Sequence, residues 1–158
     1  MLLNRLDNTM MSPRAEALLF SAARAQLVDE VLRPALDAGK LVLCDRFYDS
    51  TLAYQGYGHR LDLDALRQVT AFATGGLVPD VTVYLDCPPE VGLKRKVAQA
   101  EWNRLDGMTL EFHQRVCRGF AALIEADPER WVRVDARPEP DAVYAQIVTA
   151  LRLRGVKL

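Results

Sequence analysis

The sequence lacks any strong excess of charge of one sign. It contains 20 lysine and arginine residues and 21 aspartate and glutamate residues, for a formal net charge of −1 at neutral pH. Proteins that bind duplex nucleic acid or anionic lipid present a basic surface, so this balance gives no sign of either partner. It does not exclude a small anionic ligand, because such a ligand needs only a few local cations.

Cysteine and long apolar runs are also scarce. Cys44, Cys87 and Cys117 are far apart, and no Cys-x-x-Cys or Cys/His spacing suggests a metal site. Two of them lie in or beside short apolar runs, which is typical of buried thiols in a reducing compartment. No apolar run approaches the ~20 residues that cross a membrane, and the first residues lack a signal-peptide pattern. We therefore expect a cytoplasmic protein without a membrane partner.

The sequence does contain the length and apolar content of one folded domain. Half of its 158 residues are apolar and 26% are charged. That length is enough for one hydrophobic core and short for two. We therefore expect residues 1–158 to form a single domain.

Helical patterns occupy most of the chain. Ser12 and Pro13 predict an N-cap and first turn, followed by an alanine-rich helix that Pro34 should bend or interrupt and Gly39 should close. Periodicity predicts further helices at about 50–56, 63–73, 89–100, 110–126 and 139–153.

Three short apolar runs, at 41–44, 81–85 and 131–134, predict buried strands. Strands that alternate with helices indicate a parallel sheet covered by helices, which is an α/β fold. Asp45, Asp86 and Asp135 follow the three runs. Ligands of such sheets bind outside the carboxyl ends of the strands, so these aspartates mark a candidate site. Aspartate after a strand is also a common cap or turn residue, and that interpretation stays open for Asp86 above all.

The densest group of ligand-binding side chains follows Asp45. Arg46 offers a planar guanidinium that suits a phosphate. Hydrogen-bonding groups continue at helical spacing at Ser50, Thr51, Tyr54 and Gln55. Upstream, Phe20 and Arg24 share one helix face, where a ring could stack on a base beside a cation. Core packing of Phe20 and a solvated charge at Arg24 are the simpler interpretation of that pair taken alone.

Taken in order, these segments resemble bacterial thymidylate kinases. The resemblance runs through the segments 12–26, 44–47, 50–56, 79–86, 89–95, 103–106, 112–116 and 134–136. It covers nearly the whole chain without large gaps. Its specificity comes from the ordered set rather than from one motif.

The resemblance implies a three-layer P-loop kinase-like α/β fold with a mostly parallel sheet. It implies transfer of the γ-phosphoryl group of ATP to dTMP, giving ADP and dTDP with Mg²⁺. The ligands it implies are therefore dTMP and ATP, with no nucleic acid. Relatives are commonly dimers packed through helices, so it also implies a homodimer.

The resemblance also assigns roles to residues around the nucleotide. It implies that Phe20 stacks on thymine and that Arg24 contacts the base. Arg46 would hold the phosphate of dTMP, and Asp45 would lie near the metal, which is held mainly through phosphates with Asp45 as a candidate ligand. The implied thymidine pocket is lined by Ser50, Thr51, Tyr54 and Gln55.

A mobile lid over ATP corresponds to residues 94–106. Within it, Arg104 is implied to neutralise charge on the transferred phosphoryl group. Arg95 and Asp135 are assigned to the ATP side, although Arg95 could equally be a structural residue. Catalysis is thus expected from Asp45, Arg46 and Arg104.

One motif of this family is lacking. A P-loop kinase carries Gly-x-x-x-x-Gly-Lys-Ser/Thr after its first strand, where backbone amides cradle the phosphates, and the sequence contains no such stretch. The resemblance therefore corresponds to the C-terminal three-quarters of the family's domain. We expect that the natural protein continues upstream of Met1. The alternatives are a fragment without catalysis that retains at most thymidylate binding, and a related kinase for another nucleotide.

Overall fold

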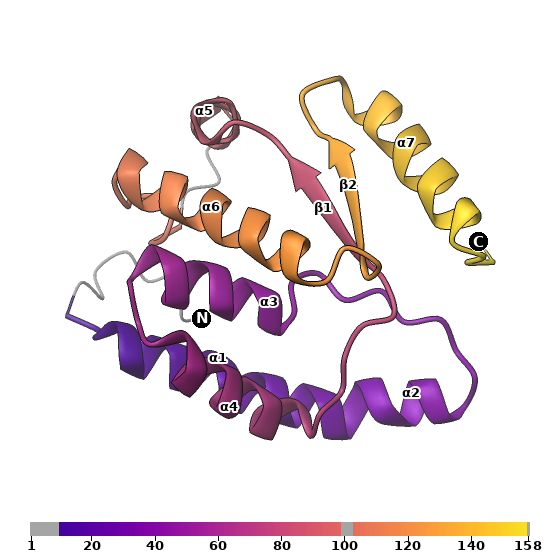
Figure 1. Ribbon diagram of the computed structural model, residues 1–158, viewed down its shortest axis with the longest axis horizontal. Helices are drawn as coiled ribbons and strands as arrows, with labels where there is room; N and C mark the ends of the chain where they lie inside the picture. Colours follow the sequence, from indigo (N-terminus) through magenta and orange to yellow (C-terminus); the bar gives the residue numbers. More distant parts are fainter. Residues whose placement is uncertain (1–9, 99–102, 158) are drawn as a thin grey trace. The chain divides into compact units, whose positions relative to one another are not determined.

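A computed structural model describes residues 10–98 and 103–157 (Figure 1). The described residues form two compact units, each made of two stretches of chain. Unit 1 takes its residues from 1–78 and 103–123, and unit 2 from 79–102 and 124–158. The expected single domain stays a prediction.

Unit 1 begins with one continuous helical segment. Its parts are α1 (Pro13–Leu27), the π-helical η1 (Val28–Leu32) and α2 (Arg33–Asp37). The Ser12 side chain caps α1 by accepting a hydrogen bond from the Ala15 amide at 3.2 Å. Pro34 has no N–H, and its ring crowds the preceding turn of the helix. The wider π-helical turn before Pro34 relieves this crowding. Gly39, at φ 71°, closes the segment as expected.

The remaining helices of unit 1 are α3 (Tyr48–Thr51), the π-helical η2 (Leu52–Gly58), α4 (Leu63–Thr74) and the greater part of α6 (Leu110–Ala126). Of these, α3, η2 and α4 pack against α1, and α6 packs against η2. The Asp62 side chain caps α4 by accepting from the Ala65 amide at 2.7 Å. The core residues include Ala17, Leu52, Ala53, Leu66, Phe112 and Val116. The helices predicted at 63–73 and 110–126 are confirmed.

The strand predicted at 41–44 is wrong. Within the described residues this segment has no strand partner, and the side chains of Leu41 and Leu43 are 60% and 83% exposed. Only Val42 packs inward, against a cluster formed by Val28, Leu32 and Phe47. A strand is stabilised by backbone hydrogen bonds to a neighbour, so an apolar run alone does not make one.

Unit 2 contains a parallel pair of strands. β1 (Thr82–Asp86) pairs with β2 (Trp131–Asp135) in a register that places Asp86 opposite Asp135. The unit also contains α5 (Pro89–Ala98) and α7 (Pro140–Leu153). The predicted α/β class and parallel pairing are confirmed, and the end of the helix predicted at 89–100 lies outside the described residues. None of the helices in the described ranges is long and apolar enough to cross a bilayer.

Candidate functional site

The loop before α3 holds Arg46 in an unusual backbone conformation. Its φ of 63° lies in the left-handed region, which a residue with a Cβ rarely adopts. The Cys44 thiol makes a weak hydrogen bond of 3.5 Å to the Arg46 carbonyl oxygen. The Arg46 guanidinium carbon lies 5.1 Å from the centroid of the Tyr54 ring. Strain of this kind concentrates at ligand-binding sites, where surrounding contacts hold it in place.

The surroundings of Arg46 preserve its charge. Partial desolvation by itself lowers the pKa of the Arg46 guanidinium. The Tyr54 hydroxyl, Asp45 and Asp106 more than offset that effect, so the pKa lies above its ordinary value. Arg46 therefore carries a full positive charge, as a phosphate-binding residue requires.

Arg24 reaches from α1 to the same loop. Its Nη2 donates to the Phe47 carbonyl oxygen at 3.2 Å, and its guanidinium carbon lies 5.7 Å from the Phe47 ring centroid. Burial lowers its pKa, and Cys44 and Asp49 oppose that shift. Its Nη1 is buried without a hydrogen-bond partner among the described residues. Buried donors are rarely left unpaired, so a carbonyl or phosphate oxygen of a ligand fits this position.

Two other predicted residues occupy half-buried positions in this region. Phe20 lies one helical turn before Arg24 in α1. The Tyr54 ring packs against Phe112 and Phe120 at centroid distances of 6.3 Å. This packing fixes the ring that carries the hydroxyl beside Arg46.

The four predicted pocket residues divide into two kinds. Ser50 and Tyr54 are half-buried, whereas Thr51 and Gln55 face the interior of unit 1. The Gln55 side chain is 2% exposed, and its Nε2 donates to Oε1 of Glu16 at 2.5 Å. Contacts of Thr51 and Gln55 with dTMP stay predictions.

Glu16 was missed by reasoning from the sequence. It lies in α1, is 1% exposed, and forms an ion pair with Nη2 of Arg104 in addition to its bond with Gln55. One signal was present, since Glu16 is an acidic residue between two alanines, one turn before Phe20 on the face assigned to the ligand.

Arg104 is presented by a hydrogen-bonded turn at the start of the α6 segment. Oδ1 of Asn103 accepts from the Leu105 and Asp106 amides at 2.9 and 3.3 Å, and Oδ2 of Asp106 accepts from the Asn103 amide at 3.0 Å. Leu105 is buried, and the Arg104 side chain is 12% exposed. The structure thus brings Arg104 into the same unit as Arg24 and Arg46. Of the predicted lid at 94–106, residues 99–102 lie outside the described residues.

His59 lies beside this cluster as a neutral group. Its Nε2 is 3.7 Å from Oε1 of Glu16. That carboxylate is already held by Gln55 and Arg104. Burial lowers the pKa of His59, and the positive charge of the nearby Arg115 lowers it further. We therefore assign His59 no positive charge near neutral pH.

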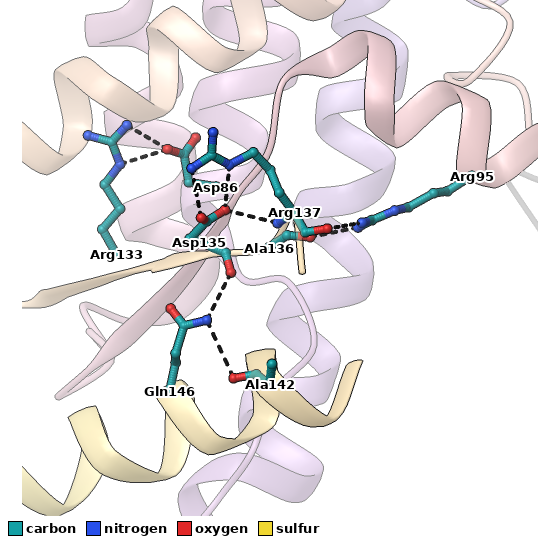
Figure 2. A network of polar contacts seen from close by, with 8 residues as sticks. All are labelled: Asp86, Arg95, Arg133, Asp135, Ala136, Arg137, Ala142 and Gln146. Atoms are coloured by element: carbon teal, nitrogen blue, oxygen red, sulfur yellow. Dashed lines mark hydrogen bonds and ion pairs between the residues drawn. The ribbon is translucent and has the colours of Figure 1, made fainter. Parts of the chain in front are cut away.

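Both strand-end aspartates of unit 2 are held by arginines (Figure 2). Nε and Nη2 of Arg133 donate to Oδ2 of Asp86 at 2.9 and 2.5 Å. Nε and Nη2 of Arg137 donate to the two oxygens of Asp135 at 2.9 and 2.8 Å. The Arg137 guanidinium and its backbone amide hold the pKa of Asp135 at about 2. The parallel register brings two like charges together, and each arginine compensates one of them.

Arg95 binds the chain that follows β2 rather than a carboxylate. Its Nη1 and Nη2 donate to the carbonyl oxygens of Ala136 and Arg137 at 2.6 and 2.5 Å (Figure 2). This contact joins α5 to the loop after β2 within unit 2. Asp135 thus lies at the carboxyl end of β2, as the sequence predicted, and Arg95 contacts the loop that follows it. The assignment of both residues to ATP stays a prediction.

The acidic residues suit a metal that is held mainly by its substrate. Within the described ranges, no group of three or more histidine, cysteine, aspartate or glutamate side chains could enclose a metal ion. Asp45 is a single exposed carboxylate beside Arg46. One carboxylate plus phosphate oxygens is a usual environment for Mg²⁺, so Asp45 fits that ion.

Comparison with known proteins adds a second line of evidence. Residues 1–147 match the family model described as thymidylate kinase. The chain is 55% identical to thymidylate kinase of Roseiflexus sp. (strain RS-1) over 154 residues, which covers 90% of this chain and 68% of that protein. It is 52% identical to thymidylate kinase of Synechococcus sp. (strain JA-2-3B'a(2-13)) over 143 residues, covering 90% and 68% of the two chains. It is 51% identical to thymidylate kinase of Deinococcus radiodurans over 143 residues, covering 90% and 69%.

Proposed function

The chain belongs to the thymidylate kinase family, and on this basis we propose that it transfers the γ-phosphoryl group of ATP to dTMP, giving ADP and dTDP. The observation that carries the proposal is the position of Arg46, a charged, strained arginine beside Tyr54 in one of the segments that resemble the family. An oxygen of the dTMP phosphate attacks the γ-phosphorus, and the bond from that phosphorus to the bridging oxygen of ADP breaks. Catalysis rests on positioning and charge stabilisation, without a covalent enzyme intermediate.

Different residues of unit 1 are assigned to different parts of dTMP. Arg46 binds the acceptor phosphate, and Phe20 stacks on the thymine ring while Arg24 bonds its edge. Arg104 neutralises charge that spreads over the transferred group. Pocket contacts with the nucleoside are assigned to Ser50, Thr51, Tyr54 and Gln55.

In unit 2, Arg95 and Asp135 are assigned to the ATP side. Arg95 and Asp135 order the loop after β2, and we assign this loop to contacts with ATP. Mg²⁺, when bound through phosphate oxygens and Asp45, would neutralise their charge.

We place this activity in the cytoplasm and assign it to a homodimer. All three cysteines are free thiols, which supports a reducing compartment. A row of exposed apolar side chains along α1 and η1 supports self-association.

The proposal is tested by two measurements on the purified 158-residue protein. Titration calorimetry compares dTMP with dUMP, dCMP and dGMP, and a coupled assay follows ADP release with ATP, Mg²⁺ and dTMP. We expect dTMP to bind most tightly. Because the sequence lacks the Gly-x-x-x-x-Gly-Lys-Ser/Thr loop of this family, the coupled assay tests catalysis separately from binding, and any ADP release should require dTMP. Binding of dTMP without ADP release would contradict catalysis by this chain. A preference for another monophosphate would contradict dTMP as the substrate.

A further inference from the structure

The buried carboxylate of Glu16 in unit 1 is not explained by packing alone. Glu16 is 1% exposed on the inward face of α1. Moving a carboxylate out of water is costly, and apolar residues of similar size often replace buried ion pairs without loss of stability. Stability alone therefore does not account for a glutamate at this position.

The two oxygens of Glu16 bind two different segments of the chain. Oε1 accepts from Gln55 of η2 at 2.5 Å, and Oε2 pairs with Arg104 of the 103–106 turn. Together with α1, these are the segments that carry most of the residues assigned to dTMP. Glu16 thus stands where three parts of the proposed site meet.

We propose that Glu16 is a positioning residue for the dTMP site, which sets the places of Arg104 and Gln55 without touching the substrate. This inference rests on the proposed function. Arg104 is long, and its ion pair with Glu16 fixes the position of its guanidinium inside unit 1. A guanidinium held in place before the substrate arrives loses less conformational freedom on binding.

The chemistry of the two partners requires a carboxylate here. Gln55 and Arg104 both present hydrogen-bond donors to Glu16. Only an ionised carboxylate has two oxygens that both accept and neither donates. A glutamine at this position would place its amide NH₂ group, a donor, opposite a donor of Gln55 or Arg104. It would also leave the Arg104 charge buried without compensation. An aspartate keeps the charge but is one methylene shorter.

Gln55 extends the effect toward the phosphate end of the site. It is adjacent in η2 to Tyr54, whose ring lies under the Arg46 guanidinium. By holding Gln55, Glu16 fixes the turn of helix that carries Tyr54. A displaced side chain at 16 is therefore expected to alter the binding of base and phosphate alike.

The first test compares Glu16→Gln and Glu16→Asp with Glu30→Gln, a control on η1 whose carboxylate accepts from Gln26 at the surface. Calorimetry with dTMP, steady-state kinetics and urea unfolding are measured for each. We expect Glu16→Gln to weaken dTMP binding and lower kcat by about tenfold to a hundredfold, with Glu16→Asp between it and wild type. Glu30→Gln should stay within about twofold of wild type.

A double-mutant cycle with Arg104→Ala separates positioning from a general loss of structure. If Glu16 acts through Arg104, Glu16→Gln causes a smaller fold-loss of dTMP affinity and kcat in the Arg104→Ala background than in wild type, and the loss that remains reflects Gln55. Additive losses would overturn the proposal, as would wild-type binding and turnover by Glu16→Gln.

The two hypotheses fail in different ways. A wild-type protein that neither binds nor phosphorylates dTMP refutes the proposed function, and with it this inference. A wild-type protein active on dTMP beside an equally active Glu16→Gln variant refutes this inference alone. Should Glu16→Gln unfold, the cycle is run with Glu16→Asp, and additive losses overturn the proposal in the same way.

Discussion

Two arginines of unit 1, Arg46 and Arg60, adopt the left-handed backbone conformation, with φ values of 63° and 60°. This region costs a residue with a Cβ roughly 1–2 kcal/mol. Glycine avoids that cost but loses about 0.5–1 kcal/mol more than alanine through backbone entropy. Replacement of either arginine by glycine should therefore change the free energy of unfolding only slightly.

The two positions should nevertheless differ in function. We predict that Arg46→Gly weakens dTMP binding by about 10- to 100-fold, since it removes a charge-assisted hydrogen bond worth about 1.5–3 kcal/mol. Arg60→Gly, the matched control, should leave dTMP affinity within about twofold of wild type. Calorimetry gives the affinities, and urea unfolding should place both variants within about 1 kcal/mol of wild type.

The opposite pattern would remove Arg46 from the binding site. Equal dTMP affinity in wild type and Arg46→Gly, with both proteins folded, contradicts the phosphate role. Equal losses in the two variants would show that dTMP binding responds to the loops generally rather than to this guanidinium.

For single residues, the sequence indicated those whose role can be inferred from their type and their near neighbours in the chain. Arg46 was singled out because its residue type and position suit a phosphate, whereas Arg24 was assigned through the resemblance to the family, and both roles stay predictions. Glu16 was not singled out, because a single acidic residue in a helix is usually exposed. Its burial depends on Gln55, 39 residues along the chain, and on Arg104, still further away. Contacts of this range leave no periodic signal in a single sequence.

Among the secondary-structure elements, those fixed by local patterns were predicted well. α4, α6, α7, β1 and β2 lie within about two residues of their expected bounds, because caps, prolines and periodicity mark their ends. The run at 41–44 had the composition of a strand but lacks a strand partner in the described part of the chain. The π-helical turns η1 and η2 were also not foreseen, since they arise from crowding around Pro34 and from packing inside unit 1.

Close packing of α6 against η2 leads to an element-scale prediction. A Cβ added at Gly119 would lie 2.7–2.8 Å from Tyr57 ring and Cβ atoms, whereas one added at Gly92 of α5 meets nothing within 4 Å. We predict that Gly119→Ala lowers the free energy of unfolding by about 1 kcal/mol, since overpacking of about 1–3 kcal/mol exceeds the gain in helix propensity. Gly92→Ala should raise it by up to about 1 kcal/mol.

Urea unfolding of the two alanine variants decides this point. A Gly119→Ala protein as stable as Gly92→Ala would show that α6 can move away from Tyr57 at little cost. Such a result would weaken the view that η2 is held rigidly against its neighbours. It would also weaken the argument that Tyr54, in the same π-helical segment, is fixed in place for Arg46.

At the scale of the whole molecule, self-association concerns an exposed apolar stripe on α1 and η1. Leu19, Ala23, Leu27 and Val31 repeat every four residues, so they share one helix face, and all four are exposed. A net charge of −1 gives little electrostatic repulsion between copies. An exposed row of this kind on a soluble helix is typical of a protein interface, which supports the proposed homodimer.

We predict that the double change Leu27→Glu and Val31→Glu converts the dimer into a monomer. Two carboxylates on each copy would meet their counterparts across a symmetric interface, where burial of unpaired charge is strongly unfavourable. Light scattering coupled to size-exclusion chromatography, over a dilution series, gives the mass of each species. Tyr144→Glu on α7, also at an exposed position, is the control and should remain dimeric. A wild-type protein that is monomeric at every concentration, or a double variant that keeps the dimer mass, would exclude this face as the interface.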